Sequence, residues 1–231
     1  MTTVFISGAT RGIGWELSTQ YLRSGHTVFA TFRDQTGLDS LNTLVNSTTN
    51  GSLTTLQLDV TSDSEVKAAR TKLEGVTIDV LINNAGIMGG NAQSVDNMDY
   101  EDWLEVLQVN VIGPFRLAKA FKENLHLSNS PRIVTLSSIM GSLNRDSSGH
   151  YAYRSSKAAV NKVMKLLSED LRDDGIVVCP IHPGWVQTDM GGAGAPIPVD
   201  KSAKGIISLI ESLTPEHSGR FWEWDGTELP W

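Results

Sequence analysis

The chain has 231 residues, 40% of them hydrophobic, and a formal net charge of −7 at pH 7. This length and composition suit one large α/β domain with a substantial core. An acidic balance without a basic cluster argues against binding to nucleic acid or to an anionic membrane. No apolar run approaches the ~18 residues of a membrane-spanning helix, so we expect no membrane span.

The cysteine and histidine content argues against disulfides and metal sites. Cys179 is the only cysteine, which excludes an internal disulfide and suits a reducing compartment. It lies in the apolar run Ile176–Ile181, so we expect a buried structural thiol. The five His residues show no metal-ligand spacing, and no metal site is expected. A strand-like segment from about Thr3 leaves no room for a signal peptide, and we expect a cytoplasmic protein.

The first segments in chain order predict a strand, a glycine loop and a helix. The apolar run Thr3–Ser7 leads into Gly8-Ala-Thr-Arg-Gly12-Ile-Gly14, and the amphipathic segment Trp15–Leu22 follows. Glycines permit a tight turn and let the backbone approach a pyrophosphate at a helix N-terminus. An ordinary strand–helix turn is the alternative, but three glycines in this context favour a dinucleotide loop. The spacing is G-x-x-x-G-x-G, not the commoner G-x-G-x-x-G.

The end of the second predicted strand indicates which dinucleotide binds. The strand pattern Thr27–Phe32 is followed by Arg33 and then by Asp34. An acid at this position would bind the ribose hydroxyl of NAD, whereas an arginine accommodates the 2′-phosphate of NADP. Because Arg33 comes first and Arg11 in the glycine loop is a second cation, we expect NADP(H) to be preferred over NAD(H). The alternative for either arginine is a solvated surface charge.

The alternation of strand and helix patterns continues to the end of the chain. Strands are expected at 53–58, 77–82, 132–136, 176–181 and 219–224, and helices at 38–45, 62–73, 100–125, 151–172 and 202–213. This alternation predicts a single α/β domain of Rossmann type over residues 1–231, a doubly wound parallel sheet of about seven strands with helices on both faces. The segment Gly191–Pro198, rich in Gly, Ala and Pro, predicts a flexible substrate lid near 189–200.

Several polar residues fall at strand ends or inside helices. Asp59 follows the third strand, where it either meets an adenine amino group or caps the next helix. Asn83-Asn-Ala-Gly86 follows the fourth strand, where amides can tie neighbouring strands together beside a cofactor. Asn110 and Gly113-Pro114 lie within the helix expected at 100–125. The interior proline predicts a kink, and a buried Asn110 would need a hydrogen-bond partner.

Tyr153 and Lys157 are four residues apart on a predicted helix, so their side chains share one face. A nearby ammonium favours the phenolate and is expected to lower the pKa of Tyr153. Such a tyrosine can exchange a proton with a carbonyl or alcohol oxygen. Tyr151 is a weaker candidate because its neighbour one turn later is Ser155. The alternative is a surface lysine beside a half-buried tyrosine.

Together these motifs resemble the short-chain dehydrogenase/reductase family over nearly the whole chain. The matching elements are Gly8-x-x-x-Gly12-x-Gly14, Asn83-Asn-Ala-Gly86, Asn110, Ser138, Tyr153-x-x-x-Lys157 and Pro183-Gly184. The run His182–Gly191 and the ending Phe221-Trp-x-Trp-Asp-Gly resemble the branch of sniffer-type carbonyl reductases and C-factor-like proteins.

The resemblance implies a catalytic role for four residues. Ser138 would orient the substrate oxygen, with adjacent Ser137 as a rival, and Tyr153 would supply the proton. Lys157 would lower the pKa of Tyr153 and hold the nicotinamide ribose, and Asn110 would hold a water that links Lys157 to solvent. No metal is required.

The resemblance also implies the binding residues. The cofactor would contact Gly8, Thr10, Arg11, Gly12, Ile13, Gly14, Arg33, Asp59, Val60, Asn84, Ala85, Gly86, Pro183, Gly184, Val186 and Thr188. The substrate pocket would include Met190 and Trp185, although Trp185 could instead belong to the core.

The implied activity is the NADPH-dependent reduction of a ketone, aldehyde or α-dicarbonyl to an alcohol. A second reading, of another class, is a dinucleotide-binding sensor or signalling protein of C-factor type with little turnover. Relatives commonly pair through the two long helices, here 100–125 and 151–172, so we expect a homodimer or homotetramer.

Overall fold

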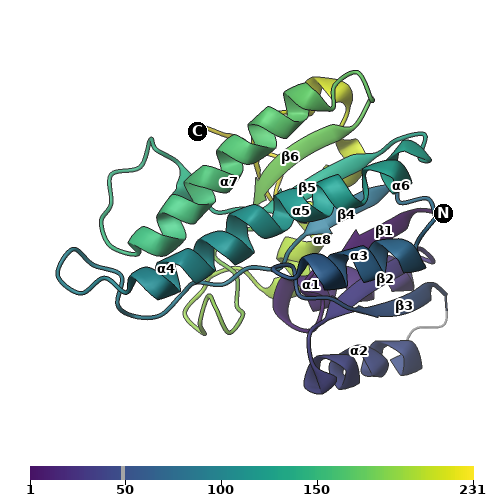
Figure 1. Ribbon diagram of the computed structural model, residues 1–231, viewed down its shortest axis with the longest axis horizontal. Coiled ribbons are helices and arrows are strands. Elements are labelled where there is room, and N and C mark those ends of the chain that lie inside the picture. The colour runs from purple at the N-terminus through teal and green to yellow at the C-terminus, as the bar shows by residue number, and fades with distance from the viewer. Residues whose placement is uncertain (48–49) are drawn as a thin grey trace.

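An eight-stranded sheet runs through the middle of the molecule (Figure 1). The structure is a computed structural model that describes residues 1–47 and 50–231. The strand order is β3-β2-β1-β4-β5-β6-β7-β8; β1 to β7 are parallel, and β8 is antiparallel to β7. The predicted Rossmann-type fold is therefore confirmed, with one short antiparallel edge strand beyond the seven expected.

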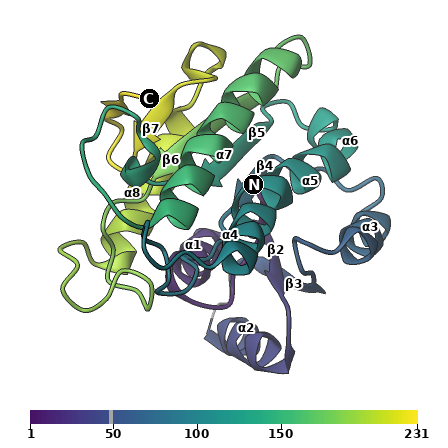
Figure 2. The same ribbon diagram turned by 60° about the vertical axis from the view of Figure 1, so that its left-hand side comes forward.

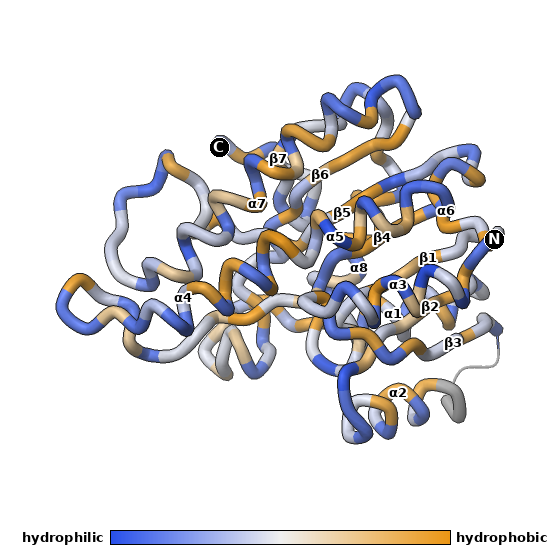
Figure 3. The backbone as a smooth tube through the Cα atoms, viewed as in Figure 1, coloured by the Kyte–Doolittle hydropathy of each residue, from blue (hydrophilic) through white to orange (hydrophobic). Residues whose placement is uncertain are grey.

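The strands are short, and each ends at the same edge of the sheet except β8. Their bounds are β1 Thr3–Ile6, β2 Thr27–Phe32, β3 Ser52–Gln57, β4 Val80–Asn83, β5 Arg132–Leu136, β6 Val177–His182, β7 Phe221–Glu223 and β8 Glu228–Leu229. Every residue of β4 and β6 is buried, because helices cover both faces of a parallel sheet. Figure 3 shows β6 as a largely hydrophobic stretch of chain.

Helices form a layer on each face of the sheet (Figures 1 and 2). One layer contains α1 (Gly12–Arg23), α2 (Gln35–Ser47) and α8 (Val199–Ser212). The other contains α3 (Asp63–Lys72), α4 (Tyr100–Leu107), α5 (Gly113–Ala120), α6 (Lys122–His126) and α7 (Tyr151–Asp170). Observed and expected bounds differ by a few residues. The polar sequence at 46–52 is also typical of a turn, and its residues 48 and 49 lie outside the described part.

The helix expected at 100–125 is divided, and its irregularity differs from the predicted proline kink. A π-helical turn, Gln108–Ile112, separates α4 from α5, and the Gly113 N–H donates to the Gln108 carbonyl five residues back. Pro114 then lies in the first turn of α5, where a missing N–H costs little. The π-helical turn, and not the proline ring, is therefore the irregularity between α4 and α5.

The aromatic ending of the chain packs against the rest of the domain. Trp222 is buried in the core with α8. Trp231 stacks on Phe221 with ring centroids 5.8 Å apart. The Trp231 carbonyl oxygen accepts a hydrogen bond from the Leu143 N–H at 2.7 Å. These contacts fasten the loop after β5 to the C-terminal edge of the sheet.

Within the described residues, no helix combines the length and the apolar character needed to cross a bilayer.

Phe121 connects α5 to α6 and is fully buried, with its ring centroid 4.5 Å from that of Phe5 in β1. We expect Phe121→Ala to lower the free energy of unfolding by about 3–5 kcal/mol, because the substitution leaves a cavity. Leu127→Ala, at a position 52% exposed, should change it by less than ~1 kcal/mol. Denaturant unfolding of both variants measures the difference, and equal losses would contradict the packing described for the core.

Candidate active site

A cavity of about 690 Å³ opens along the edge of the sheet where the parallel strands end. Ligands bind at this edge in open α/β sheets because the loops after the strands meet there. The predicted site residues that line the cavity are Gly8, Thr10, Arg11, Gly12, Ile13, Arg33, Asp59, Val60, Asn84, Ala85, Gly86, Tyr153, Lys157, Pro183, Thr188 and Met190. The predicted residues outside its wall are Gly14, Asn110, Ser138, Gly184, Trp185 and Val186.

The glycine loop forms one end of the cavity, and its glycines are needed for geometry. Gly8 and Gly12 have φ of +65° and +56°, which most residues avoid. A Cβ on Gly8 would lie 2.8 Å from the Ala85 Cα. A Cβ on Gly14 would lie 2.4 Å from Asn84 Nδ2, so this glycine allows α1 to pack against the loop after β4. The cradle of bare backbone at the start of α1 fits a dinucleotide phosphate.

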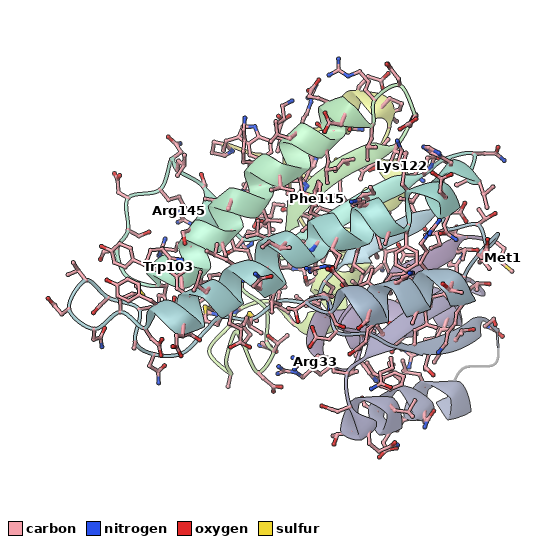
Figure 4. The ribbon with its side chains drawn as sticks, in the orientation of Figure 1. Met1, Arg33, Trp103, Phe115, Lys122 and Arg145 are labelled. Atoms are coloured by element: carbon pink, nitrogen blue, oxygen red, sulfur yellow. The ribbon has the colours of Figure 1, made fainter. Side chains whose placement is uncertain are left out.

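The two charged residues weighed for cofactor choice lie next to each other in the loop after β2. Arg33 lines the cavity, and Figure 4 shows its side chain extending from this loop. Asp34 also lines the cavity, but its Oδ1 accepts the Gly37 N–H at 2.8 Å and so caps α2. Arg11 is not directed to the same place as Arg33, because its Nη1 forms an ion pair with Asp189 Oδ2 at 2.7 Å. This pair crosses between the glycine loop and the loop after β6.

Asp59 lies two residues beyond β3, in a local turn. Its Oδ1 accepts hydrogen bonds from the backbone N–H and the hydroxyl of Thr61, at 2.8 and 2.7 Å. Partial burial alone would raise the pKa of Asp59, but these bonds and the charges of Arg33 and Arg116 lower it. The side chain of Ser62, not of Asp59, caps α3. The capping alternative is therefore wrong, and an ionised carboxylate faces the cavity.

Tyr153 and Lys157 lie on the same face of α7, as their spacing predicts. The Lys157 Nζ is 5.5 Å from the centre of the Tyr153 ring, and it donates to the Leu136 carbonyl at 2.8 Å. Burial raises the pKa of Tyr153, and a hydrogen bond with Ser138 opposes this rise. Burial also lowers the pKa of Lys157 to about 8. The predicted lowering of the Tyr153 pKa is wrong, because desolvation of the phenol exceeds the opposing interactions.

The two serines after β5 have different partners. The Ser137 hydroxyl donates to Asn161 Oδ1 at 2.6 Å, which commits it to α7. The Ser138 hydroxyl interacts with Tyr153 and accepts the Met140 N–H at 3.1 Å. The structure thus brings Ser138, and not its rival, to the phenol.

Asn110 lies in the π-helical turn and is buried below the cavity wall. Its Oδ1 accepts the Ile87 N–H at 2.9 Å, and its Nδ2 donates to the Ile87 carbonyl and to Ser156 Oγ, at 2.8 and 3.0 Å. A Cβ on Gly86 would lie 3.2 Å from Asn110 Oδ1 and 3.6 Å from Lys157 Nζ. The amide therefore joins the loop after β4 to α7 directly beneath the lysine.

The loop after β6 is tied back on itself. Val186 pairs with Ile197 in an isolated bridge, and the Ile197 N–H donates to the Trp185 carbonyl at 3.2 Å. Met190 lines the cavity, whereas the Trp185 indole is more than half exposed and donates to the Gly191 carbonyl at 2.7 Å. Trp185 is thus neither a core residue nor part of the cavity wall. The mobility expected for residues 189–200 stays a prediction.

Two buried side chains that support the site were missed in the sequence. Asn161 follows Tyr153 and Lys157 on the same stripe of α7, and this spacing could have identified it. Gln93 contacts the backbone of Tyr153 from a loop 60 residues away, and no local pattern indicates such a contact. Among the described residues, no cluster of His, Cys, Asp or Glu could hold a metal ion.

Comparisons with known proteins identify the family of the chain. The family model described as short chain dehydrogenase matches residues 2–195. The C-signal of Myxococcus xanthus is 44% identical over 155 residues, covering 67% of this chain and 93% of that protein.

Two solved structures share the whole fold. The carbonyl reductase Sniffer of D. melanogaster has a TM-score of 0.91 at 32% identity, covering all of both chains. An NADPH-bound carbonyl reductase from chicken fatty liver has a TM-score of 0.90 at 33% identity, covering all of this chain and 94% of the other. This chain therefore belongs to the short chain dehydrogenase family, and the predicted resemblance, including its sniffer and C-factor-like branch, is confirmed.

Proposed function

We propose that this protein is an NADPH-dependent oxidoreductase that reduces a ketone, aldehyde or α-dicarbonyl to the alcohol, with Tyr153 as the proton donor. Tyr153 and Lys157 line a cavity that also contains a glycine cradle, and Ser138 hydrogen-bonds the phenol; this arrangement carries the proposal. The family membership supports the reaction type. The two carbonyl reductases of the same fold support the substrate class and, for the chicken protein, NADPH.

The protonation states suit the direction of reduction. Burial raises the pKa of Tyr153, so the phenol keeps its proton at neutral pH and can donate it to a carbonyl oxygen. The Ser138 hydroxyl would hydrogen-bond the same oxygen and orient it beside the phenol. A bound nicotinamide would supply the hydride. Lys157, held by the Leu136 carbonyl, would stabilise the negative charge left on Tyr153.

NADPH is the proposed cofactor because Arg33 presents a cation to the cavity at the end of β2, while Asp34 is committed to capping α2. An arginine at this position matches a 2′-phosphate and not a ribose hydroxyl. The glycine cradle at the start of α1 would hold the pyrophosphate.

Removing the phenol oxygen tests the proton-donor role. We expect Tyr153→Phe to lower kcat/KM for carbonyl reduction by about 1,000-fold, within the range for loss of a general acid. The dissociation constant for NADPH, measured by fluorescence titration, should stay within about threefold of the wild-type value, because the cradle is unaffected. Near-normal turnover in this variant would refute the role of Tyr153.

Reversing the charge after β2 tests the cofactor preference. We expect Arg33→Asp to weaken NADPH binding by about 10- to 100-fold, the loss of a charge-assisted hydrogen bond, and to spare or improve NADH binding. Arg70→Asp, an exposed position on α3, is the matched control and should leave both affinities unchanged. An unaltered preference in Arg33→Asp would exclude a phosphate contact by this arginine.

The protonation of Lys157 determines the pH dependence that we expect for carbonyl reduction. Its pKa of about 8 means that the charge is present below pH 8 and is lost as the pH rises through that value. We therefore expect kcat/KM for reduction to be flat at neutral pH and to fall above pH 8. Lys157→Met should lower kcat/KM by about 100-fold and remove this inflection. An inflection at the same pH in Lys157→Met would assign it to another group.

A second candidate function is dinucleotide-dependent signalling, which the similarity to the C-signal favours. Gly12→Asp would place a carboxylate in the cradle at a positive φ that Asp tolerates better than most residues. If Gly12→Asp abolishes a cellular function that Tyr153→Phe preserves, cofactor binding matters there and chemistry does not. Loss of the function in both variants supports the reductase, which needs the cofactor and the phenol.

Self-association is proposed through the outer surface of α4, α5 and α7. Leu104, Phe115 and Leu166 are exposed on these helices at 63%, 45% and 51%. Apolar side chains of this size on one helical layer favour a homodimer or homotetramer.

A cytoplasmic location is proposed on the single buried cysteine, which suits a reducing compartment.

A further inference from the structure

Gln93 belongs to the loop between β4 and α4 and is almost fully buried, with 4% of its surface exposed. Its Oε1 accepts the backbone N–H of Tyr153 at 3.1 Å. Its Nε2 donates to the Met88 and Gly90 carbonyls, both at 2.8 Å. If the amide were flipped, its NH₂ group would face the Tyr153 N–H, and its oxygen would face the Met88 and Gly90 carbonyl oxygens. These partners therefore fix the orientation in which Oε1 points to α7.

The N-terminus of α7 has no cap of its own. His150 occupies the N-cap position at φ +51°, a left-handed conformation, and its side chain makes no capping hydrogen bond. The first N–H groups of a helix have no partner within the helix, and an N-cap side chain normally accepts from the second or third of them. Tyr153 is the third residue of α7. Gln93 therefore takes the place of the cap, from a different part of the chain.

The loop on the other side of this amide is closely confined. The Gly90 N–H donates to Asp102 Oδ2 of α4 at 2.9 Å. Gly89 has φ +82°, and a Cβ there would lie 2.7 Å from Asp102 Oδ2 and 3.0 Å from Gln93 Nε2. Gln93 thus joins α7 to a loop that α4 already fixes.

We propose that Gln93 is a positioning residue for Tyr153: its amide fastens the first turn of α7 to the loop 88–90 and so holds the phenol in place. The catalytic part of this inference rests on the proposed function. Helix ends fray, and Tyr153 projects from the first turn, so its position depends on that turn staying formed. A displacement of about 1 Å in a reacting group can lower a rate about 100-fold.

Three substitutions distinguish the role of the Gln93 side chain from that of the rest of its loop. Gln93→Met has a similar length and makes none of the side-chain hydrogen bonds, while the backbone bond from the Tyr151 N–H to the carbonyl of residue 93 remains. Gln93→Glu keeps an acceptor for the Tyr153 N–H but loses the Nε2 donor. Asn97→Ala is the control in the same loop, where Asn97 Oδ1 accepts only from Ser94 among its described bonds, at the N–H (3.2 Å) and the hydroxyl.

We expect Gln93→Met to lower kcat for carbonyl reduction by about tenfold, with NADPH affinity unchanged. The backbone amides of residues 151–154 should exchange with deuterium faster, since the first turn has lost its cap. Gln93→Glu should also lose turnover and protection, because its second carboxylate oxygen would face the Met88 and Gly90 carbonyls and break the link to loop 88–90. Asn97→Ala should match the wild type in both, and this control separates positioning from a general effect of changing the loop.

Hydrogen exchange of the backbone amides is measured without substrate, so it tests whether Gln93 fastens the first turn of α7 even if Tyr153→Phe refutes the catalytic role. Unchanged exchange at residues 151–154 in Gln93→Met would show that Gln93 does not fasten this turn. Faster exchange with unchanged kcat would overturn the positioning of Tyr153. Wild-type kcat and exchange in Gln93→Glu would show that the bonds to the Met88 and Gly90 carbonyls are irrelevant, which also overturns the proposal.

Discussion

The structure of the site depends on burying the ammonium group of Lys157 at the end of the central strand β5. Taking a cation out of water is unfavourable unless it is hydrogen-bonded, and the Leu136 carbonyl supplies one such bond. The same burial lowers the pKa of Lys157 to about 8 and raises that of Tyr153. Helix α7 and the sheet edge must therefore stay closely packed, because solvent entry would change both protonation equilibria.

Side chains from three separate elements hold α7 in that position. Ser137 at the end of β5 binds Asn161, and Trp103 of α4, labelled in Figure 4, donates from its indole to Ser155 Oγ at 2.9 Å. Asn110 of the π-helical turn binds Ser156. These bonds join residues 24 to 52 positions apart, so they fix the helix only when the whole layer has folded. Buried hydrogen bonds between side chains of distant segments can rigidify a site in this way.

The other end of the cavity is built differently, from bare backbone. Glycines remove the side chains that would collide with Ala85 or Asn84, and they leave N–H groups at the start of α1 for an anion. The pair between Arg11 and Asp189 crosses the opening, but both side chains are largely exposed, so it contributes little stability. A weak contact across a binding cleft opposes ligand exchange less than a buried one would.

Local patterns in the sequence determined the strand–helix alternation, the glycine loop and the shared face of Tyr153 and Lys157, because each depends on residues within a few positions of one another. They could not determine the direction of the Tyr153 pKa shift, which depends on burial. Nor could they show which partner Arg11 takes or that Gln93 reaches α7. Only the tertiary structure decided these points, since solvent exclusion and contacts between distant segments exist only after the layers have packed around the sheet.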